Sequence, residues 1–136
     1  MTIVVGIDGS VEANRALEWA VSEARRRHMD LTVLHAWYPA VGTDETAAQT
    51  VVDEAIELAR LLDPTVEVRG RLEERALAAE ALVDASWDAE LVVVGTEVHF
   101  AFASLLLGSV AGACVRRCHC PVVVVPAAAR ELRTAS

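Results

Sequence analysis

The chain has 136 residues, 54% of them hydrophobic, and its 12 basic and 20 acidic residues give a formal net charge of −8. This length fits one compact domain, and the apolar fraction excludes a disordered chain. The acidic balance disfavours binding to nucleic acid or to anionic lipid, because both present negative phosphates. All the basic residues are arginine, so chemistry that needs a lysine amine, such as a Schiff base or a P-loop lysine, is excluded.

The first residues, MTIVVGIDGS, lack the basic segment that opens a signal peptide, so we expect a cytoplasmic protein. Residues 98–115 contain no Asp, Glu or Arg and are long enough to raise the question of a membrane span. His99, Ser104 and the glycines within this segment argue against one. We therefore expect no membrane contact.

The first half of the chain alternates strand and helix patterns. Residues 3–7 form a β-branched apolar run, as expected for a central parallel strand that is covered on both faces. Residues 11–27 have apolar positions at helical spacing, with Glu12 in the first turn. A second strand is predicted over 31–37, and a second helix has its apolar positions between 51 and 62.

The second half continues the alternation. Residues 65–71 alternate apolar and polar positions, which predicts an edge strand, and a helix is predicted over 75–86. A buried strand over 91–94, a helix over 109–117 and a last strand over 122–125 complete the pattern. This order predicts a parallel sheet with helices on both faces. In such a sheet ligands bind outside the carboxyl ends of the strands, where the winding reverses.

Five strings, IVVGIDGS, LTVLHAW, LVVVG, FASLLLGSV and CPVVVVP, follow one another between residues 3 and 126. In this order and spacing the chain resembles the universal stress protein family. The resemblance implies an α/β three-layer sandwich of the adenine nucleotide alpha hydrolase-like kind, with five parallel strands in the order 3-2-1-4-5. It also implies a domain over residues 1–126, which leaves residues 127–136 as a flexible C-terminal tail.

Nucleotide-binding members of that family carry Gly-x2-Gly-x9-Gly-Ser/Thr after the fourth strand. Gly95 and the pair Gly108-Ser109 match this spacing, whereas Val98 replaces the second glycine. A valine side chain fits poorly where a glycine backbone must approach a phosphate. The resemblance thus implies ATP or another adenine nucleotide, with weakened phosphate affinity and no metal beyond the Mg²⁺ that accompanies ATP. The binding positions that it implies are Ile7, Asp8, Ala36, Gly95, Thr96, Gly108, Ser109 and Val110.

The roles that the resemblance implies for these residues have alternatives. Asp8 is placed to accept from ribose hydroxyls, but it also suits an N-terminal helix cap, and Ser109 suits a cap after a glycine turn. Val98 and the segment His99–Phe102 offer a second function, in which they fill the phosphate pocket and a nucleotide-free protein acts through contacts with unknown protein partners. His99 is the residue there that can replace a lost cation.

An enzyme of the wider adenine-nucleotide class, such as a ligase or pyrophosphatase, needs a glycine-serine-rich first loop that Asp8-Gly9-Ser10 alone does not supply. No Ser-His-Asp set or metal-ligand set converges in the sequence. We therefore expect no catalysis beyond slow ATP hydrolysis or autophosphorylation at Ser109. His35 is expected to be a packed, hydrogen-bonded histidine rather than a catalytic one.

Cys114, Cys118 and Cys120 are odd in number and clustered, which predicts reduced thiols that act as small apolar side chains. A metal site that includes His119 is the alternative. The resemblance also implies a homodimer through the last strand, Val122–Val125, whose apolar, uncharged edge would otherwise invite aggregation.

Overall fold

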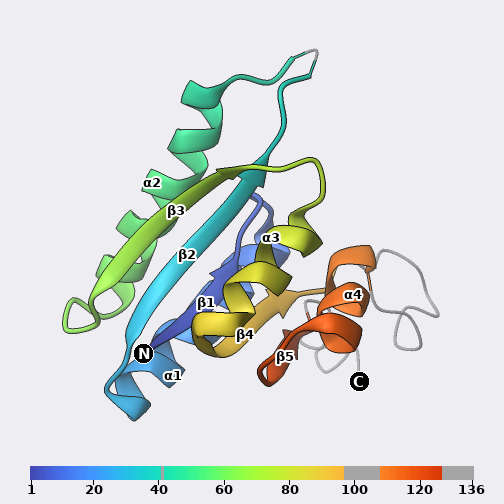
Figure 1. Cartoon of the computed structure of the whole chain (residues 1–136). Helices are drawn as coiled ribbons and strands as arrows, with labels where there is room; N and C mark the ends of the chain where they lie inside the picture. The colour runs from blue at the N-terminus through green and yellow to red at the C-terminus, as the bar shows by residue number, and fades with distance from the viewer. Residues whose placement is uncertain (41, 97–107, 127–136) are drawn as a thin grey trace, which may run out of the picture.

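The computed structural model describes residues 1–40, 42–96 and 108–126. Within them the chain forms a three-layer α/β sandwich with a five-stranded parallel sheet (Figure 1). The strand order, β3-β2-β1-β4-β5, confirms the predicted order. The strands are β1 (Thr2–Gly6), β2 (Asp30–Trp37), β3 (Val68–Glu74), β4 (Ala89–Gly95) and β5 (Val122–Val125). The helices are α1 (Val11–Arg27), α2 (Glu45–Leu62), α3 (Ala78–Ala85) and α4 (Ser109–Arg117), with a 3-10 turn, η1 (Ser86–Asp88), after α3.

The central strand β1 sets the register of the sheet. Val4 of β1 lies opposite Thr32 of β2 on one side and opposite Val92 of β4 on the other. All neighbouring strands are parallel, so their carboxyl ends meet at one edge of the sheet. The chain winds outward from β1 in both directions, which places the topological switch point between β1 and β4.

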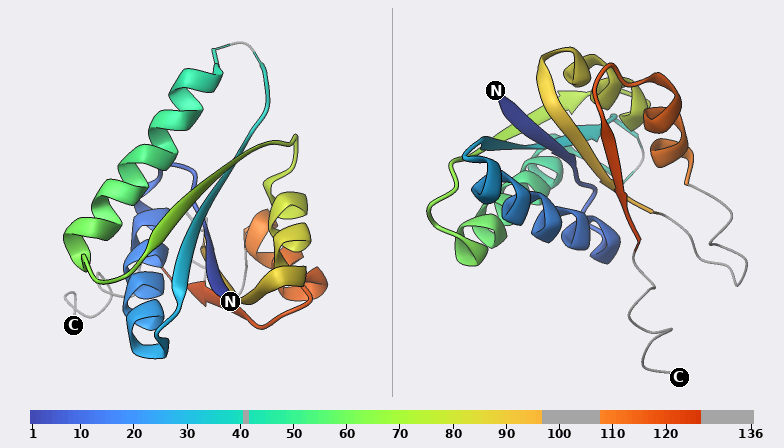
Figure 2. Two further views of the ribbon diagram at one scale, coloured as in Figure 1. Left: turned by 60° about the vertical axis from the view of Figure 1, so that its left-hand side comes forward. Right: turned by 90° about the horizontal axis from the view of Figure 1, so that it is seen from below.

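Helices α1 and α2 cover one face of the sheet and α3 and α4 cover the other (Figure 2). Because successive side chains of a strand point to opposite faces, Ile3 and Val5 pack toward α1 and α2, whereas Val4 packs toward α3 and α4. All three side chains are buried. Burial on both faces explains why β1 reads as a continuous apolar run rather than an alternating one.

The two helical layers differ in length and in how they begin. Helix α2 starts at Glu45, before the apolar positions that predicted it, because the Asp44 side chain accepts from the Ala47 N–H and caps the helix. Helix α3 has only eight residues and no side-chain cap at Leu77. No helix in the described part of the chain combines the length and apolarity needed to cross a bilayer.

The predicted bounds of two neighbouring elements, β3 and α3, are wrong. The edge strand predicted over 65–71 runs from Val68 to Glu74, because its pairing with β2 starts at Leu31 opposite Val68 and continues to the end of β2. The Arg75 N–H then donates to the Trp37 carbonyl at 2.8 Å, which extends the sheet contact further. The helix predicted over 75–86 therefore begins only at Ala78.

Candidate functional site

The loop after β1 is held by two side chains that bond to backbone. The Ser10 N–H donates to Asp8 Oδ1 at 2.9 Å, and the Ala13 N–H donates to Ser10 Oγ at 3.1 Å. Between them Gly9 has φ +84°, a left-handed conformation that glycine adopts without strain. The cap of α1 is therefore Ser10, and the alternative that Asp8 caps this helix is wrong. Asp8 remains exposed, with its carboxylate oriented by the turn.

His35 ties the end of β2 to the end of β1. Its Nδ1 lies 2.9 Å from the Ile7 carbonyl oxygen, and the Ile7 N–H donates to the Leu34 carbonyl at 2.9 Å. A carbonyl oxygen only accepts, so this bond requires the proton on Nδ1. His35 is half-buried. These contacts match the expected packed, hydrogen-bonded histidine, and they fix the backbone of Ile7 beside the switch point.

The end of β4 lies against the start of α1. A β-carbon added at Gly95 would lie 2.8 Å from the Glu12 carbonyl oxygen, which is closer than real β-carbons approach. Glycine is therefore required here by a backbone contact within the protein. Thr96 follows, and its N–H donates to the Val125 carbonyl of β5 at 3.2 Å. The first glycine of the predicted phosphate motif thus has a structural role as well.

Helix α4 begins with Gly108 as its cap and Ser109 as its first helical residue. The Ser109 side chain makes no capping hydrogen bond and is exposed, so the alternative that Ser109 caps this helix is wrong. Gly108 has φ −61° and ψ 165°, an extended conformation open to any residue. The first N–H groups of a helix have no partner within the helix, and together with the positive end of the helix dipole they favour an anion.

These segments enclose a cavity at the carboxyl ends of β1, β2 and β4, with about 520 Å³ of atom-free space that is partly open to solvent. Ile7, Asp8, Ala36, Gly95, Thr96 and Val110, all predicted as binding residues, line this cavity. Gly108 and Ser109 lie beside it at the start of α4 but are not lining residues. The remaining lining residues are Gly6, Ser10, Glu12, Ala13, Leu34, Ala78, Leu82 and Val94.

Of this last group, the sequence does not indicate Glu12, Ala78 or Leu82 as lining residues. Ala78 and Leu82 come from α3, which begins at Ala78 and not at residue 75 as predicted. The sequence pattern shows Glu12 only as a favourable charge in the first turn of α1. A signal for Glu12 did exist, since the first turn of a helix that follows a strand lies at the carboxyl edge of the sheet. Val98 and the segment His99–Phe102, on which the nucleotide-free alternative depends, lie outside the described residues.

The three cysteines lie on the α3 and α4 side of the sheet, away from the first turn of α1. Cys114 is fully buried, and burial together with the neighbouring Cys118 raises the pKa of its thiol to about 12. Burial also raises the pKa of Cys120. Thiols of this kind are protonated at neutral pH and are poor nucleophiles or metal ligands. Among the described residues no three His, Cys, Asp or Glu side chains gather as a metal site.

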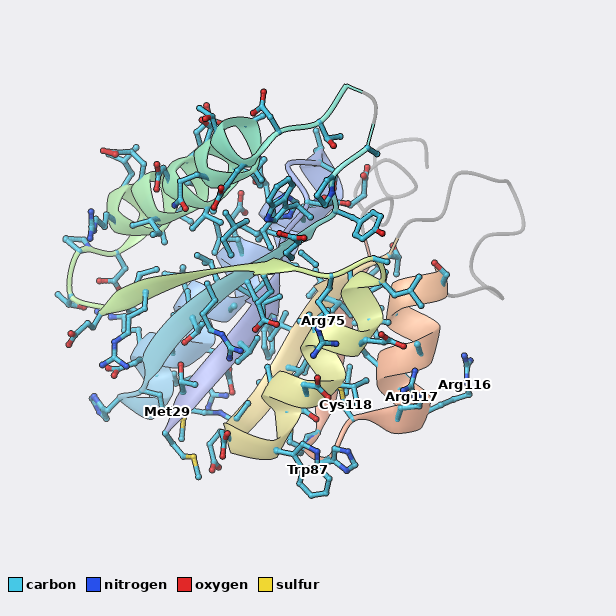
Figure 3. The ribbon with its side chains drawn as sticks, turned by 45° about the horizontal axis from the view of Figure 1, so that its top comes forward. Met29, Arg75, Trp87, Arg116, Arg117 and Cys118 are labelled. Carbon is cyan, nitrogen blue, oxygen red and sulfur yellow. The ribbon has the colours of Figure 1, made fainter. Side chains whose placement is uncertain are left out.

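The last turn of α4 carries two basic side chains. Arg116 and Arg117 are exposed in its last turn, where a cation complements the negative end of the helix (Figure 3). Cys118 follows them, and its Sγ lies 4.0 Å from the Leu82 carbonyl oxygen of α3. Beyond it, the exposed Trp87 ring stacks on His119 with ring centres 3.5 Å apart. None of these residues lines the cavity.

A parallel sheet with helices on both faces and a cavity at its switch point defines a doubly wound α/β protein. The family model of the universal stress protein family matches residues 1–126, and the chain belongs to this family. It is 34% identical over 139 aligned residues to the universal stress protein Rv2005c of Mycobacterium tuberculosis, an alignment that covers 90% of this chain and 47% of the relative. The chain thus spans about half the length of the curated relatives that it matches.

Two solved structures share the fold over nearly their whole length. A universal stress protein in complex with cAMP superposes with a TM-score of 0.75 at 26% identity, covering 92% of this chain and 96% of that one. The universal stress protein of Archaeoglobus fulgidus in complex with dAMP gives a TM-score of 0.72 at 27% identity, covering 92% and 97%. Adenine nucleotides are therefore bound by some members of the family.

Proposed function

We propose that this protein binds an adenine nucleotide or nucleoside in the cavity at the ends of β1 and β4, and acts in the stress response without catalysing a reaction. The observation that carries the proposal is that Asp8, Ala36, Gly95 and Val110, which are far apart in the sequence, line one cavity. The complexes of the two relatives with cAMP and dAMP support the same class of ligand.

The lining divides into an apolar part and a polar part, as an adenosine ligand requires. Leu34, Ala36 and Leu82 offer apolar surface suited to a base. The ionised carboxylate of Asp8 only accepts hydrogen bonds, which suits it to the two ribose hydroxyls, because these can donate. Its Oδ1 is already oriented by the Ser10 N–H, so little ordering is left to occur on binding.

The end of β4 and the start of α4 would bind the phosphate of the ligand. Gly95 and Thr96 line the cavity, and Gly108 and Ser109 present the first turn of α4 beside it. The N-terminus of this nine-residue helix attracts a single phosphate through its unpaired N–H groups.

A binding role without turnover fits the side chains of the described lining. They include the hydroxyls of Ser10 and Thr96 and the carboxylates of Asp8 and Glu12, and no histidine, cysteine or arginine. The Ser10 hydroxyl is occupied as a helix cap. We propose at most slow ATP hydrolysis or autophosphorylation at Ser109, which a Ser109→Ala control would remove.

We also propose that two copies of the chain pair through β5 in the cytoplasm. Val122–Val125 forms the outer strand of the sheet next to β4, and all of its residues are half-buried in the single chain. An apolar strand edge of this kind favours pairing with another strand. Unknown protein partners then act on the dimer.

The nucleotide proposal is tested by releasing any ligand from gently purified protein and identifying it by mass spectrometry, followed by titration with AMP and ATP. We expect either a released adenine compound or a raised melting temperature on titration. Ligand at a hundred times its Kd should increase the free energy of unfolding by about 2.7 kcal/mol. No adenine compound and no shift at millimolar concentrations would overturn the proposal. That result would favour the nucleotide-free alternative, in which the protein acts through protein contacts alone.

A matched pair of variants assigns the binding to Asp8. Asp8→Asn keeps an oxygen that accepts from the Ser10 N–H, so the turn is preserved while the charged acceptor is lost. Loss of a charge-assisted hydrogen bond should weaken adenosine binding by roughly ten- to a hundredfold. The control Asp88→Asn removes the same charge from the exposed turn η1, which does not line the cavity. Equal affinities for the two variants would exclude Asp8 as a contact.

A further inference from the structure

The charged side chains of the described cavity lining are all acidic. Among the described residues, Asp8 and Glu12 line it, and no arginine or histidine does. The chain as a whole, with these two carboxylates included, carries a net charge of −8. A cleft concentrates the field of the charges along its walls, so this cavity repels anions more strongly than a flat surface with the same two carboxylates would.

Glu12 is held at this position by the packing of α1 on β4. The helix is capped by Ser10, which fixes Glu12 in its first turn. Gly95 contacts the Glu12 backbone directly, since a β-carbon there would lie 2.8 Å from the Glu12 carbonyl oxygen and 3.5 Å from its Cβ. Glu12 is half-buried. The backbone and Cβ of Glu12 therefore lie beside the first glycine of the phosphate motif, and its side chain contributes a carboxylate to the cavity lining.

The start of α4 and Glu12 act on a phosphate in opposite directions. The N-terminus of α4 attracts the first phosphate group, as Val110 of its first turn lines the same cavity. The helix end acts like about half a positive elementary charge, and its effect falls off within the first turn of the helix. Each added phosphate brings more negative charge, whereas the helix end contributes no more attraction. Repulsion by Asp8 and Glu12 thus grows with every phosphate after the first.

From this arrangement we infer that the cavity selects its adenine ligand by phosphate charge, favouring the nucleoside or monophosphate over the triphosphate, with Glu12 as the residue that sets the preference. The inference rests on the proposed function, because it concerns the same site. The ligand that the cavity favours is adenosine or adenosine monophosphate. Free ATP is disfavoured, and Mg²⁺ reduces the discrimination because it neutralises part of the triphosphate charge.

The test is calorimetric titration of the full chain with adenosine, AMP and ATP in Mg²⁺-free buffer at low salt. We expect AMP to bind about tenfold or more tightly than ATP, a difference of about 1.4 kcal/mol. Because the preference is electrostatic, it should shrink at an ionic strength of about 1 M, where charges are screened within about 3 Å. It should also shrink when Mg²⁺ is added.

Three variants at two positions assign the preference to one side chain. Glu12→Gln should narrow the ratio of AMP to ATP affinity by several-fold, whereas Glu12→Asp, which keeps the charge, should retain it. Glu18→Gln removes the same charge from an exposed position on α1 outside the cavity. It should leave the ratio unchanged, because Glu18 lies about 9 Å further along the helix axis. The melting temperature of each unliganded variant checks that the fold is intact.

The possible results separate this inference from the proposed function. ATP binding as tightly as AMP in Mg²⁺-free buffer, or a Glu12→Gln variant with an unchanged ratio, would overturn the selectivity while nucleotide binding stands. A preference for AMP that persists unchanged at high salt would also overturn it, because charge would not be the cause. Failure of adenosine, AMP and ATP alike to bind would overturn both proposals.

Discussion

Gly95 at the end of β4 packs against Glu12 so closely that an added β-carbon would lie 2.8 Å from the Glu12 carbonyl oxygen and 3.1 Å from its carbonyl carbon. The obstacle is backbone, held by the first turn of a capped helix, and so has little freedom to move. The contact joins residues far apart in the sequence at the wall of the cavity. Gly95 is therefore needed for the fold, whatever ligand the cavity holds.

Gly95→Ala should destabilise the protein by about 1–3 kcal/mol, because α1 and β4 must separate to make room for the methyl group. The measurement is urea unfolding followed by circular dichroism. Gly6→Ala is the control, since the three nearest atoms to its added β-carbon all belong to side chains, namely two methyl groups of Leu82 at 3.0 and 3.3 Å and one of Val94 at 3.6 Å, and a side chain can shift. A Gly95→Ala variant as stable as the wild type, or less affected than Gly6→Ala, would contradict this interpretation.

The contact also marks how far the sequence predicts the site. Asp8 and Gly95 could be placed from sequence because they follow predicted strands, and the carboxyl ends of parallel strands meet. For Glu12 the sequence indicates only the carboxyl edge of the sheet, because Glu12 lies in the first turn after a strand; the packing of α1 on β4 then decides that it lines the cavity. The residues that α3 contributes, Ala78 and Leu82, depend on where that helix begins.

The fold itself was predictable where burial determined it and less so at the edge. The run over β1 is apolar on both faces, so its central position follows from sequence alone. Strand β3 is different, since Arg69, Gly70 and Arg71 are exposed and carry no burial signal. Its bounds follow instead from its register with β2, which no pattern within β3 reveals.

Two serines at helix starts should respond differently to the same change. The Ser10 hydroxyl accepts from the Ala13 N–H and caps α1, so Ser10→Ala should cost about 1 kcal/mol of unfolding free energy. Ser109 is exposed and makes no capping bond on α4, so Ser109→Ala should change stability by less than about 0.5 kcal/mol. Both values come from urea unfolding without ligand. Equal losses would show that Ser109 does cap its helix in solution.

Glu23 makes the stability of α1 depend on pH. Its buried carboxylate accepts from Arg26 at 2.6 and 2.7 Å and from Arg27 at 2.6 Å, and these bonds lower its pKa in the folded state below the ordinary value of 4.5. A lowered pKa adds stability that is fully present above the ordinary value and is lost as pH falls through the folded-state value. Wild-type stability should therefore fall in acid partly through this group.

The matching variant is Glu23→Gln, which cannot ionise. It should be less stable than the wild type at pH 7, and the gap should close as the pH falls below about 4.5, where the wild-type carboxylate takes up its proton. Unfolding by urea at a series of pH values measures the gap. Glu18→Gln, an exposed position on the same helix, should show a smaller gap throughout. A gap for Glu23→Gln that is constant with pH would rule out ionisation as the source.

The outer strand β5 allows a test of dimerisation that leaves the sheet intact. The carbonyls of Pro121 and Val125 accept from Val92 and Thr96 at 3.0 and 3.2 Å, so the backbone groups of these odd-numbered positions face β4. Alternate residues of a strand direct their backbone groups to opposite sides. The N–H of Val124 therefore points to the open edge, where a partner strand would bond to it.

Val124→Pro removes that one outward donor and no bond between β4 and β5, and proline is tolerated on edge strands. We expect the variant to fold and to be monomeric at concentrations where the wild type is dimeric, as measured by sedimentation equilibrium. Val123→Pro is the contrasting variant, because it removes a donor that faces β4 and should lower the melting temperature instead. A folded Val124→Pro variant with an unchanged dimer constant would exclude β5 as the interface and direct the search to other surfaces of the chain.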